Sequence, residues 1–339
     1  RGKSNVRLAL NYFSFVLSGF LWGLFTREKP NLVFAFEVSP MTQILPAIWF
    51  ANRRKIPCLA YIQDLWPECF MEATGISAPI IIKSINKMAD YIYHRCQKIF
   101  VTSVSFKHAV HARDIAEDKV VFWPQYAEEF YQPSDNSTLN RLQGKAFSIV
   151  FAGNIGTAQG LEILPKVVKT LRDIGHPVYF IIVGEGRGKS LLVDEIRHHQ
   201  VEDEFLFLGQ KPPEEIPAIL AGADAAYLSF SDKPLYQMTI PAKLQSYMAC
   251  GMPIIASAEG ETKKIIEEAA CGLCCETGNA EALAKTIMDF IGLPAHVRES
   301  MGAQAETYAK EHFFKSKLMD EMDAYISDSF SINHGKQGA

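Results

Sequence analysis

The sequence predicts an α/β protein made of two domains, each a parallel sheet with helices on both faces. Its 339 residues are enough for about two domains at ~150 residues each. Short apolar runs typical of buried strands alternate with helix-like segments along most of the chain. The alternation pauses at residues 131–138, a polar and turn-rich stretch, and then restarts, as expected for a linker between two domains.

The composition describes a soluble globular chain with a large core. The hydrophobic share is 48% and the net charge is -4. No excess or cluster of Lys and Arg interleaved with aromatic residues is present, which argues against nucleic-acid binding. Seven cysteines without a secretory leader favour reduced thiols in the cytosol. Cys271, Cys274 and Cys275 are either half of a zinc site or small buried apolar side chains, and without a second ligand pair no metal is expected.

The chain opens on Arg1 and then carries an uncharged run at residues 8–25. A membrane-spanning helix needs ~20 apolar residues, and this run also contains Asn11, Ser14, Ser18 and two glycines. We expect a buried or membrane-surface helix, with a true span as the alternative.

Strand-like runs are distributed unevenly between the two halves. In the first half they lie at residues 32–36, 58–62, 99–102 and 120–122. In the second half they lie at residues 147–151, 178–183, 205–208, 225–228, 253–256 and 272–275. A doubly wound domain usually has about six strands, so the first domain is expected to lack its opening strands. The expected divisions are a first domain at 1–133, a linker at 134–146, a second domain at 147–310 and a C-terminal helix at 311–330 that packs back on the first domain.

The most distinctive stretch is residues 239–257, which predicts a helix entered through Pro241 and stopped by Gly251, followed by an apolar strand. The entrance at Thr239, Ile240 and Pro241 leaves backbone N–H groups unpaired at a positive dipole end, where a phosphate group would bind. Helical spacing puts Lys243, Ser246 and Tyr247 on one side of this helix. The alternative is an ordinary helix and strand of an α/β sheet.

Further candidates follow other strands of the second half, where ligands of parallel sheets bind. Glycine in such loops allows a backbone to approach a phosphate closely, although glycine also serves turn geometry alone. The candidates are Gly153, Asn154 and Gly156 after the first strand, and Gly184, Glu185 and Arg187 after the second.

In the first half, Asp64 follows a predicted strand closely. A carboxylate at this sheet edge can accept a proton from a hydroxyl group or orient it. The structural alternative is an aspartate that caps the next helical turn.

These motifs together resemble the retaining glycosyltransferases of family 4, which have the GT-B architecture of two Rossmann-like domains facing across a cleft. The resemblance extends from Arg7 to about Phe330. It is carried by Gln63-Asp64-Leu65-Trp66-Pro67-Glu68, Phe151-Ala152-Gly153-Asn154-Ile155-Gly156, Val183-Gly184-Glu185-Gly186, and the blocks from Ile240 to Lys243 and from Met248 to Pro253.

The resemblance implies transfer of a sugar, with retention, from a nucleotide-diphosphate donor held by the second domain to a saccharide acceptor held by the first. It points to bacterial enzymes that build O-antigen, capsule or exopolysaccharide units on a lipid carrier, and to the hexosyltransferase class. Lys243 would be the counter-charge of the diphosphate, Asp64 would act on the acceptor hydroxyl, and backbone near Gly209 and Gln210 would hold the base. No cofactor is expected. The enzyme would be cytoplasmic and peripheral at the inner face of the membrane, in contact through residues 8–25.

Two departures from the family pattern lie within the distinctive stretch or just before it. Many members have two glutamates there, and this chain has Met238 and Ser246 instead. A hydrogen bond to a charged group is worth ~1.5–3 kcal/mol and a neutral one ~1 kcal/mol, so donor affinity would fall without vanishing. The basic residues that many members use in the first loop correspond to Asn154 and Gln159, which leaves Lys243, and after it Arg187, to supply charge. An inactive nucleotide-sugar-binding subunit and a sugar-nucleotide epimerase remain as alternatives.

Overall fold

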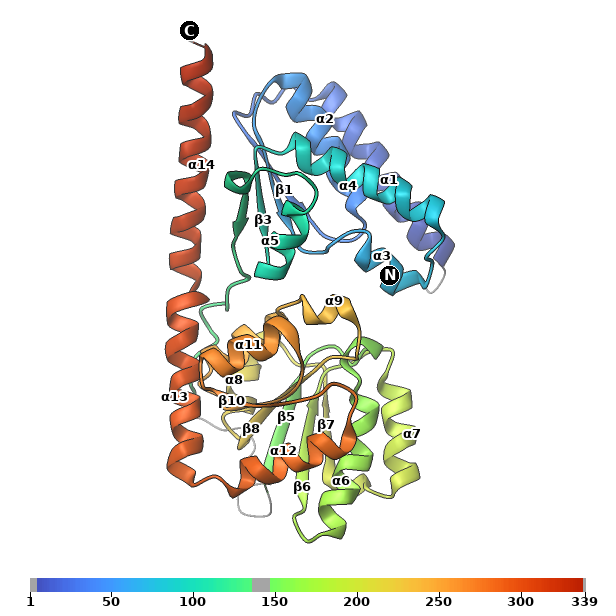
Figure 1. The fold of residues 1–339 in the computed structure, drawn as a ribbon, viewed down its shortest axis with the longest axis vertical. Helices are drawn as coiled ribbons and strands as arrows, with labels where there is room; N and C mark the ends of the chain where they lie inside the picture. Colours follow the sequence, from blue (N-terminus) through green and yellow to red (C-terminus); the bar gives the residue numbers. More distant parts are fainter. Residues whose placement is uncertain (1–4, 136–146, 338–339) are drawn as a thin grey trace. The chain divides into compact units, whose positions relative to one another are not determined.

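The computed structural model describes residues 5–135 and 147–337, and the chain separates into two compact units (Figure 1). Unit 1 comprises residues 1–124 and 319–339, and unit 2 comprises residues 125–318. Residues 125–133, which the sequence analysis assigned to the first domain, therefore group with unit 2. Most of the predicted linker, residues 136–146, lies outside the described residues.

Unit 1 contains a four-stranded parallel sheet with the strand order β1, β2, β3, β4. The strands are β1 (Val33–Glu37), β2 (Cys58–Ile62), β3 (Lys98–Val101) and β4 (Val120–Phe122). The helices are α1 (Asn5–Phe25), α2 (Leu45–Arg54), α3 (Glu68–Thr74), α4 (Pro79–Arg95) and α5 (Val104–His111). The C-terminal helix α14 (Lys315–Gln337) contributes Tyr325, whose ring packs edge-on against Phe100 at 5.4 Å between centroids.

Unit 2 contains a six-stranded parallel sheet with the strand order β10, β9, β8, β5, β6, β7. The strands are β5 (Phe147–Ala152), β6 (Val178–Val183), β7 (Phe205–Gly209), β8 (Ala225–Ser229), β9 (Ile254–Ser257) and β10 (Gly272–Cys275). The helices are α6 (Leu164–Asp173), α7 (Lys189–His199), α8 (Ile216–Leu220), α9 (Pro234–Gln237), α10 (Ala242–Ala249), α11 (Gly260–Glu268), α12 (Ala280–Gly292) and α13 (Ala295–His312). All ten predicted strands are therefore present, which confirms the predicted fold class.

Both faces of the unit 2 sheet are buried, as the continuous apolar runs predict. Along β5, Val150 and Ala152 face one core while Ile149 and Phe151 face the other, because successive side chains of a strand alternate. Helices α8, α10, α11 and α13 pack on the first core, and α6 and α12 pack on the second (Figure 1).

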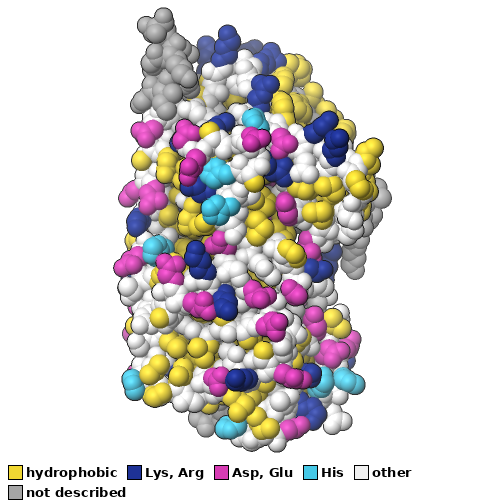
Figure 2. All heavy atoms as spheres, in the orientation of Figure 1, with side chains coloured by type: hydrophobic (Ala, Val, Ile, Leu, Met, Phe, Trp, Pro, Cys, Tyr) yellow, Lys and Arg dark blue, Asp and Glu magenta, His cyan; other side chains and the backbone are white. Residues whose placement is uncertain are grey.

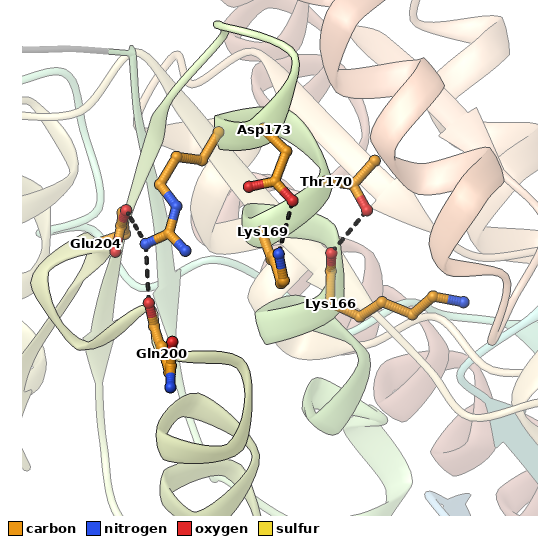
Figure 3. Close-up of polar contacts among 7 residues, drawn as sticks. Lys166, Lys169, Thr170, Asp173, Gln200 and Glu204 are labelled. Atoms are coloured by element: carbon orange, nitrogen blue, oxygen red, sulfur yellow. Dashed lines mark hydrogen bonds and ion pairs between the residues drawn. The ribbon is translucent and has the colours of Figure 1, made fainter.

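The solvent side of α6 carries ion pairs that have a structural role (Figure 3). Lys169 pairs with Asp173 one turn later at 2.6 Å. Arg172 donates to the Gln200 carbonyl at 2.8 Å and to the largely buried Glu204 at 3.0 Å, which joins α6 to the end of α7. Because exposed pairs are worth at most ~1 kcal/mol, the Arg172 bond to the buried Glu204 matters most here.

Helix α1 forms from the uncharged run and packs on α2. Gly23 leaves room for the Trp49 ring, since a Cβ there would come within 3.1 Å of it, and Phe20 contacts the same ring at 5.5 Å. The opposite side of α1 is exposed and apolar, with Leu10, Phe13, Phe15, Leu17, Leu21, Leu24 and Phe25 each at least 47% exposed. Among the described residues, none of the helices combines the length and hydropathy that a membrane span requires.

Candidate functional site

A cavity of about 580 Å³ lies at the carboxyl ends of β5, β6 and β7 in unit 2. Seven of the predicted site residues line it: Gly153, Asn154, Gly184, Glu185, Gln210, Lys243 and Ser246. The remaining lining comes from Tyr131, Ala152, Val183, Lys211, Pro213, Ile216, Ala242 and Tyr247. The carboxyl edge of a parallel sheet is where its ligands bind, so this cavity is the candidate site.

The two glycine loops at this edge pack directly on each other. The Gly153 amide donates to the Val183 carbonyl at 2.9 Å, and the Ile155 amide donates to the Glu185 carbonyl at 3.0 Å. A Cβ at Gly184 would overlap the Gly153 carbonyl oxygen, and Gly184 also has a φ of +136°. Position 184 therefore requires glycine because neighbouring backbone packs against it, whereas the sequence analysis expected glycine there so that a phosphate could approach.

Helix α10 is attached to this sheet edge by a buried tyrosine. The Tyr247 hydroxyl accepts from the Ala152 amide at 2.7 Å and donates to the Ala152 carbonyl at 3.0 Å. These two bonds hold α10 against the end of β5. They set Lys243, one turn earlier, beside Gly153, where a Cβ would lie 3.0 Å from the Lys243 Nζ atom.

The buried basic side chain of the cavity is that of Lys243. Its Nζ atom is buried with no hydrogen-bond partner among the described residues, and it lies 4.0 Å from the centroid of the Phe151 ring. Burial without a compensating anion lowers the pKa of Lys243 from 10.5 to about 7. An unpaired ammonium in the wall of a cavity can bind an anion, because the anion would replace the interactions with water that the ammonium lost on burial.

Several predicted residues do not line this cavity. Ile240 is 4% exposed within the core, and the Thr239 hydroxyl donates to the Leu235 carbonyl at 2.8 Å. Pro241 is the N-cap residue of α10, and the Gly156 amide donates to the Gln159 side chain at 3.0 Å. The other two are Gly209, whose carbonyl accepts from the Gly184 amide at 2.8 Å, and Arg187, whose side chain is exposed.

The sequence analysis missed two polar lining residues. Lys211 follows Gln210 after β7, and its position two residues beyond Gly209 was the available signal. Tyr131 comes from the connecting segment 125–133, where an aromatic residue inside a polar stretch was the only sign. Glu185, which was predicted, forms an ion pair with Lys189 at 2.6 Å.

Asp64 belongs to unit 1 and does not line this cavity. Its carboxylate accepts from the Ser39 amide at 2.8 Å, which ties the loop after β1 to the loop after β2. The N-cap residue of the following helix α3 is Pro67, so Asp64 is not the N-cap of that helix.

Glu37, the last residue of β1, is a second acid at this edge that the sequence analysis missed. It is 1% exposed, and neither carboxylate oxygen has a regular hydrogen bond among the described residues. Burial first, and then the charge of Asp64, raise the pKa of Glu37 well above its usual range. An acid at the end of an apolar strand was the available signal for Glu37.

Across residues 5–135 and 147–337, no group of three or more His, Cys, Asp or Glu side chains is arranged to hold a metal ion. All seven cysteines are free thiols, and Cys271 is fully buried.

Solved structures with the same fold include Anabaena HepE in complex with UDP and glucose. Its TM-score is 0.71 at 16% identity, over 88% of this chain and 77% of that chain. Sucrose-phosphate synthase from Thermosynechococcus elongatus has a TM-score of 0.75 at 15% identity, over 98% of this chain and 81% of that chain. These similarities confirm the GT-B fold.

Two curated relatives are similar in sequence over part of their length. The putative colanic acid biosynthesis glycosyl transferase WcaI of Escherichia coli K12 is 26% identical over 67% of this chain and 57% of its own. The 2-deoxystreptamine glucosyltransferase of Streptomyces kanamyceticus is 26% identical over 48% of this chain and 41% of its own. The chain thus spans about half the length of the curated relatives it matches.

The family described as Glycosyl transferases group 1 matches residues 136–308, which is just over half of the 339 residues. This match includes the glycine loops, the cavity edge and helix α10. The chain therefore belongs to the group 1 glycosyl transferases.

Proposed function

We propose that the protein transfers a sugar from a nucleotide-diphosphate donor, bound in the unit 2 cavity, to a saccharide acceptor during polysaccharide synthesis. The observation that carries this proposal is the buried, unpaired ammonium of Lys243 in the wall of the cavity. Proteins seldom retain such a group without a ligand for it, because an unpaired buried charge costs stability. The UDP complex of HepE and the colanic acid relative support the same donor class and pathway type.

The cavity also suggests how the donor lies. Lys243 stands at the end of β5, while Gln210 and Lys211 follow β7, two strands away. Neighbouring strands are ~4.8 Å apart, so these positions are separated by roughly 10 Å, about the reach from a diphosphate to its base. We therefore place the diphosphate at Lys243 and the base near Gln210.

In this arrangement Lys243 stabilises the negative charge that grows on the diphosphate as the glycosidic bond breaks. Catalysis without a metal is part of the proposal, because the ammonium supplies the cation. Asp64 would orient the acceptor hydroxyl or take its proton. Retention of configuration and the hexosyl class rest on the family resemblance.

We also propose that the acceptor is lipid-linked and that α1 holds the protein peripherally on the cytoplasmic face of the membrane. The exposed apolar side of α1 supports this contact, and Arg53 and Arg54, which stack on Trp49 and Phe50 of α2, add positive charge nearby. Figure 2 shows yellow side chains beside dark-blue ones on the side of unit 1 where α1 and α4 lie.

A vesicle-binding experiment tests this contact. Phe13→Glu is expected to weaken sedimentation with phosphatidylglycerol vesicles at least tenfold, since Phe13 is 68% exposed on α1. Ile174→Glu, at a site 51% exposed in unit 2, is the matched control and should bind like the wild type. Equal binding by all three proteins would remove the membrane contact from the proposal.

Calorimetric titration with UDP-, GDP- and ADP-sugars, followed by turnover with a lipid-diphosphate acceptor, tests the main proposal. Lys243→Met should lower turnover by roughly 10²–10³-fold, since it removes the charge and keeps much of the side-chain volume. Lys169→Met, a surface lysine paired with Asp173, is the control. Binding of a donor without turnover by wild-type protein would favour a binding subunit, and sugar conversion without acceptor would favour an epimerase.

A further inference from the structure

Arg113 of unit 1 is a mostly buried cation that the proposed mechanism does not use. It lies just after α5, where its amide donates to the Val110 carbonyl at 3.1 Å as the helix ends. Its side chain is 15% exposed, and its guanidinium lies 6.0 Å from the centroid of the Tyr93 ring. A charge with so little contact with water is costly unless hydrogen-bonded partners compensate for it, so the partners of Arg113 indicate its role.

The guanidinium of Arg113 joins two parts of unit 1. Its Nη1 atom donates to the Asp90 carboxylate at 2.8 Å, and its Nη2 atom donates to the Asn86 side-chain oxygen at 2.7 Å. Asn86 and Asp90 are one turn apart on α4, so both lie on the same side of that helix. The Nη2 atom also donates to the Trp66 backbone carbonyl at 3.2 Å. Arg113 therefore fastens the loop after β2 to helix α4.

The loop that Arg113 holds is the one that carries Asp64. Where this loop leaves β2, the Gln63 amide donates to the Glu37 carbonyl at 2.9 Å. Asp64 follows Gln63 directly and stands two residues before Trp66. The backbone around Asp64 is therefore held on one side by the neighbouring strand and on the other side by the guanidinium.

The three bonds depend on the shape of a guanidinium. Arginine carries five N–H donors in a planar fork, so one side chain can bind a carboxylate, an amide oxygen and a backbone carbonyl at once. The bonds to Asp90 and Asn86 orient the fork, and the remaining donor reaches the Trp66 carbonyl. None of the three bonds is made to the Asp64 side chain, so the geometry gives Arg113 an effect on Asp64 through the backbone of the loop.

We propose that Arg113 is a positioning residue for sugar transfer, which holds the backbone of residues 63–66 so that the Asp64 carboxylate stays within reach of the acceptor hydroxyl. This inference rests on the proposed function, since it needs Asp64 to act on the acceptor. A misplacement of about 1 Å at a reacting group can cost roughly 10²-fold in rate. Loss of Arg113 should therefore lower kcat and leave donor binding in unit 2 unchanged.

The first measurement follows the loop itself, by hydrogen exchange of residues 63–66 read by mass spectrometry. In Arg113→Met these amides should exchange at least ~tenfold faster than in the wild type, the effect expected from losing one hydrogen bond with a charged donor. Lys119→Met is the matched control. It removes another basic side chain of unit 1 that donates to a backbone carbonyl, that of His94 at 3.2 Å, and should leave exchange in the loop unchanged.

The second measurement is turnover with the nucleotide-sugar donor and the lipid-diphosphate acceptor. Arg113→Met should lower kcat by roughly 10²-fold while the dissociation constant of the donor stays within about twofold of the wild-type value. In the Asp64→Asn background the same change should cost less than about threefold, because the carboxylate that Arg113 positions is already absent. A merely structural role would lower kcat by the same factor in both backgrounds.

A second variant covers the case in which Arg113→Met does not fold. Asp90→Ala keeps Arg113 but removes the ion pair that orients its guanidinium, at a side chain that is 44% exposed and can be lost without burying an unpaired group. It should lower kcat at least ~threefold when Asp64 is present and have little effect in Asp64→Asn.

The outcomes separate this inference from the proposed function. Unchanged exchange in the loop of a folded Arg113→Met, or equal losses of kcat with and without Asp64, would overturn the role of Arg113 and leave the donor site and Asp64 in place. Normal turnover by Asp64→Asn would remove Asp64 from the mechanism, and this inference with it. Absence of turnover by the wild type with every donor would overturn the proposed function itself.

Discussion

Donor binding should depend on pH through Lys243. In the free protein burial lowers the pKa of this ammonium to about 7, so near neutral pH only about half of the molecules carry the charge. A diphosphate binds the charged form and raises the pKa in the complex. Binding is therefore accompanied by proton uptake, and the dissociation constant should rise with pH above 7.

The size of the effect follows from this linkage. If only the protonated form binds, the dissociation constant is proportional to one plus the ratio of neutral to charged lysine. Between pH 7 and pH 9 this quantity rises roughly 50-fold for a pKa of about 7, provided the pKa in the complex exceeds 9. Phosphate titration of UDP contributes little in this range, because its second pKa lies near 6.

Isothermal titration of UDP, or of the tightest nucleotide found, at pH 7, 8 and 9 in two buffers of different ionisation enthalpy measures both affinity and proton uptake. Lys243→Arg, whose guanidinium stays charged, should show a nearly flat profile, and Lys243→Met should bind weakly at every pH. A wild-type dissociation constant that changes less than threefold from pH 7 to pH 9 would refute the reasoning.

Three more predictions concern stability and catalysis. Lys243→Met should raise the free energy of unfolding in the absence of ligand by up to roughly 5 kcal/mol at pH 6 but only roughly 2 kcal/mol at pH 9. The reason is that the buried charge of Lys243 destabilises the folded state fully below pH 7, and this cost fades as the pH rises toward 10.5, where the unfolded chain also loses the proton. Equal gains in the free energy of unfolding at both pH values, measured by urea denaturation, would contradict this prediction. Gly184→Ala should destabilise unit 2 by at least ~2 kcal/mol, because the new Cβ overlaps a loop carbonyl. The control Gly175→Ala is also at positive φ but has open space around it, and should cost only ~1 kcal/mol. Similar urea midpoints for the two variants would argue against this packing. Asp64→Asn keeps an oxygen that can accept from the Ser39 amide, so donor affinity should stay unchanged while turnover falls by at least ~10²-fold. Normal turnover would exclude Asp64 from acceptor chemistry.

The strands and the main helix of the site could be predicted from the sequence because their signals are local. Each strand of the two sheets is a short apolar run between turn residues, and all ten were found. The helix after Pro241 and its end near Gly251 follow from the restricted backbone of proline and the freedom of glycine. Helical spacing also predicted correctly that Lys243, Ser246 and Tyr247 share a side, since all three line the cavity.

The residues that were missed or misread depend on contacts between distant parts of the chain. Tyr131 lines the cavity only because bonds near Phe313 and Lys315 hold its segment in place. Gly184 is required by a backbone more than 30 residues away, which no local pattern could indicate. In the sequence Glu37 is only the last residue of a strand, and its raised pKa arises only from burial beside Asp64.

Lys243, which lines the cavity, illustrates which properties the sequence determines and which depend on the tertiary structure. By itself the sequence determined the order of the elements, the parallel sheets and the presence of a lysine near a helix entrance at the ligand-binding edge, because these depend on periodicity and backbone preference. Only the tertiary structure decided that the Nζ atom of Lys243 is buried over Phe151 without an anion, and that Tyr131 from the connecting segment lines the same cavity. Solvation and charge depend on everything that surrounds an atom, and those surroundings exist only once the chain has folded.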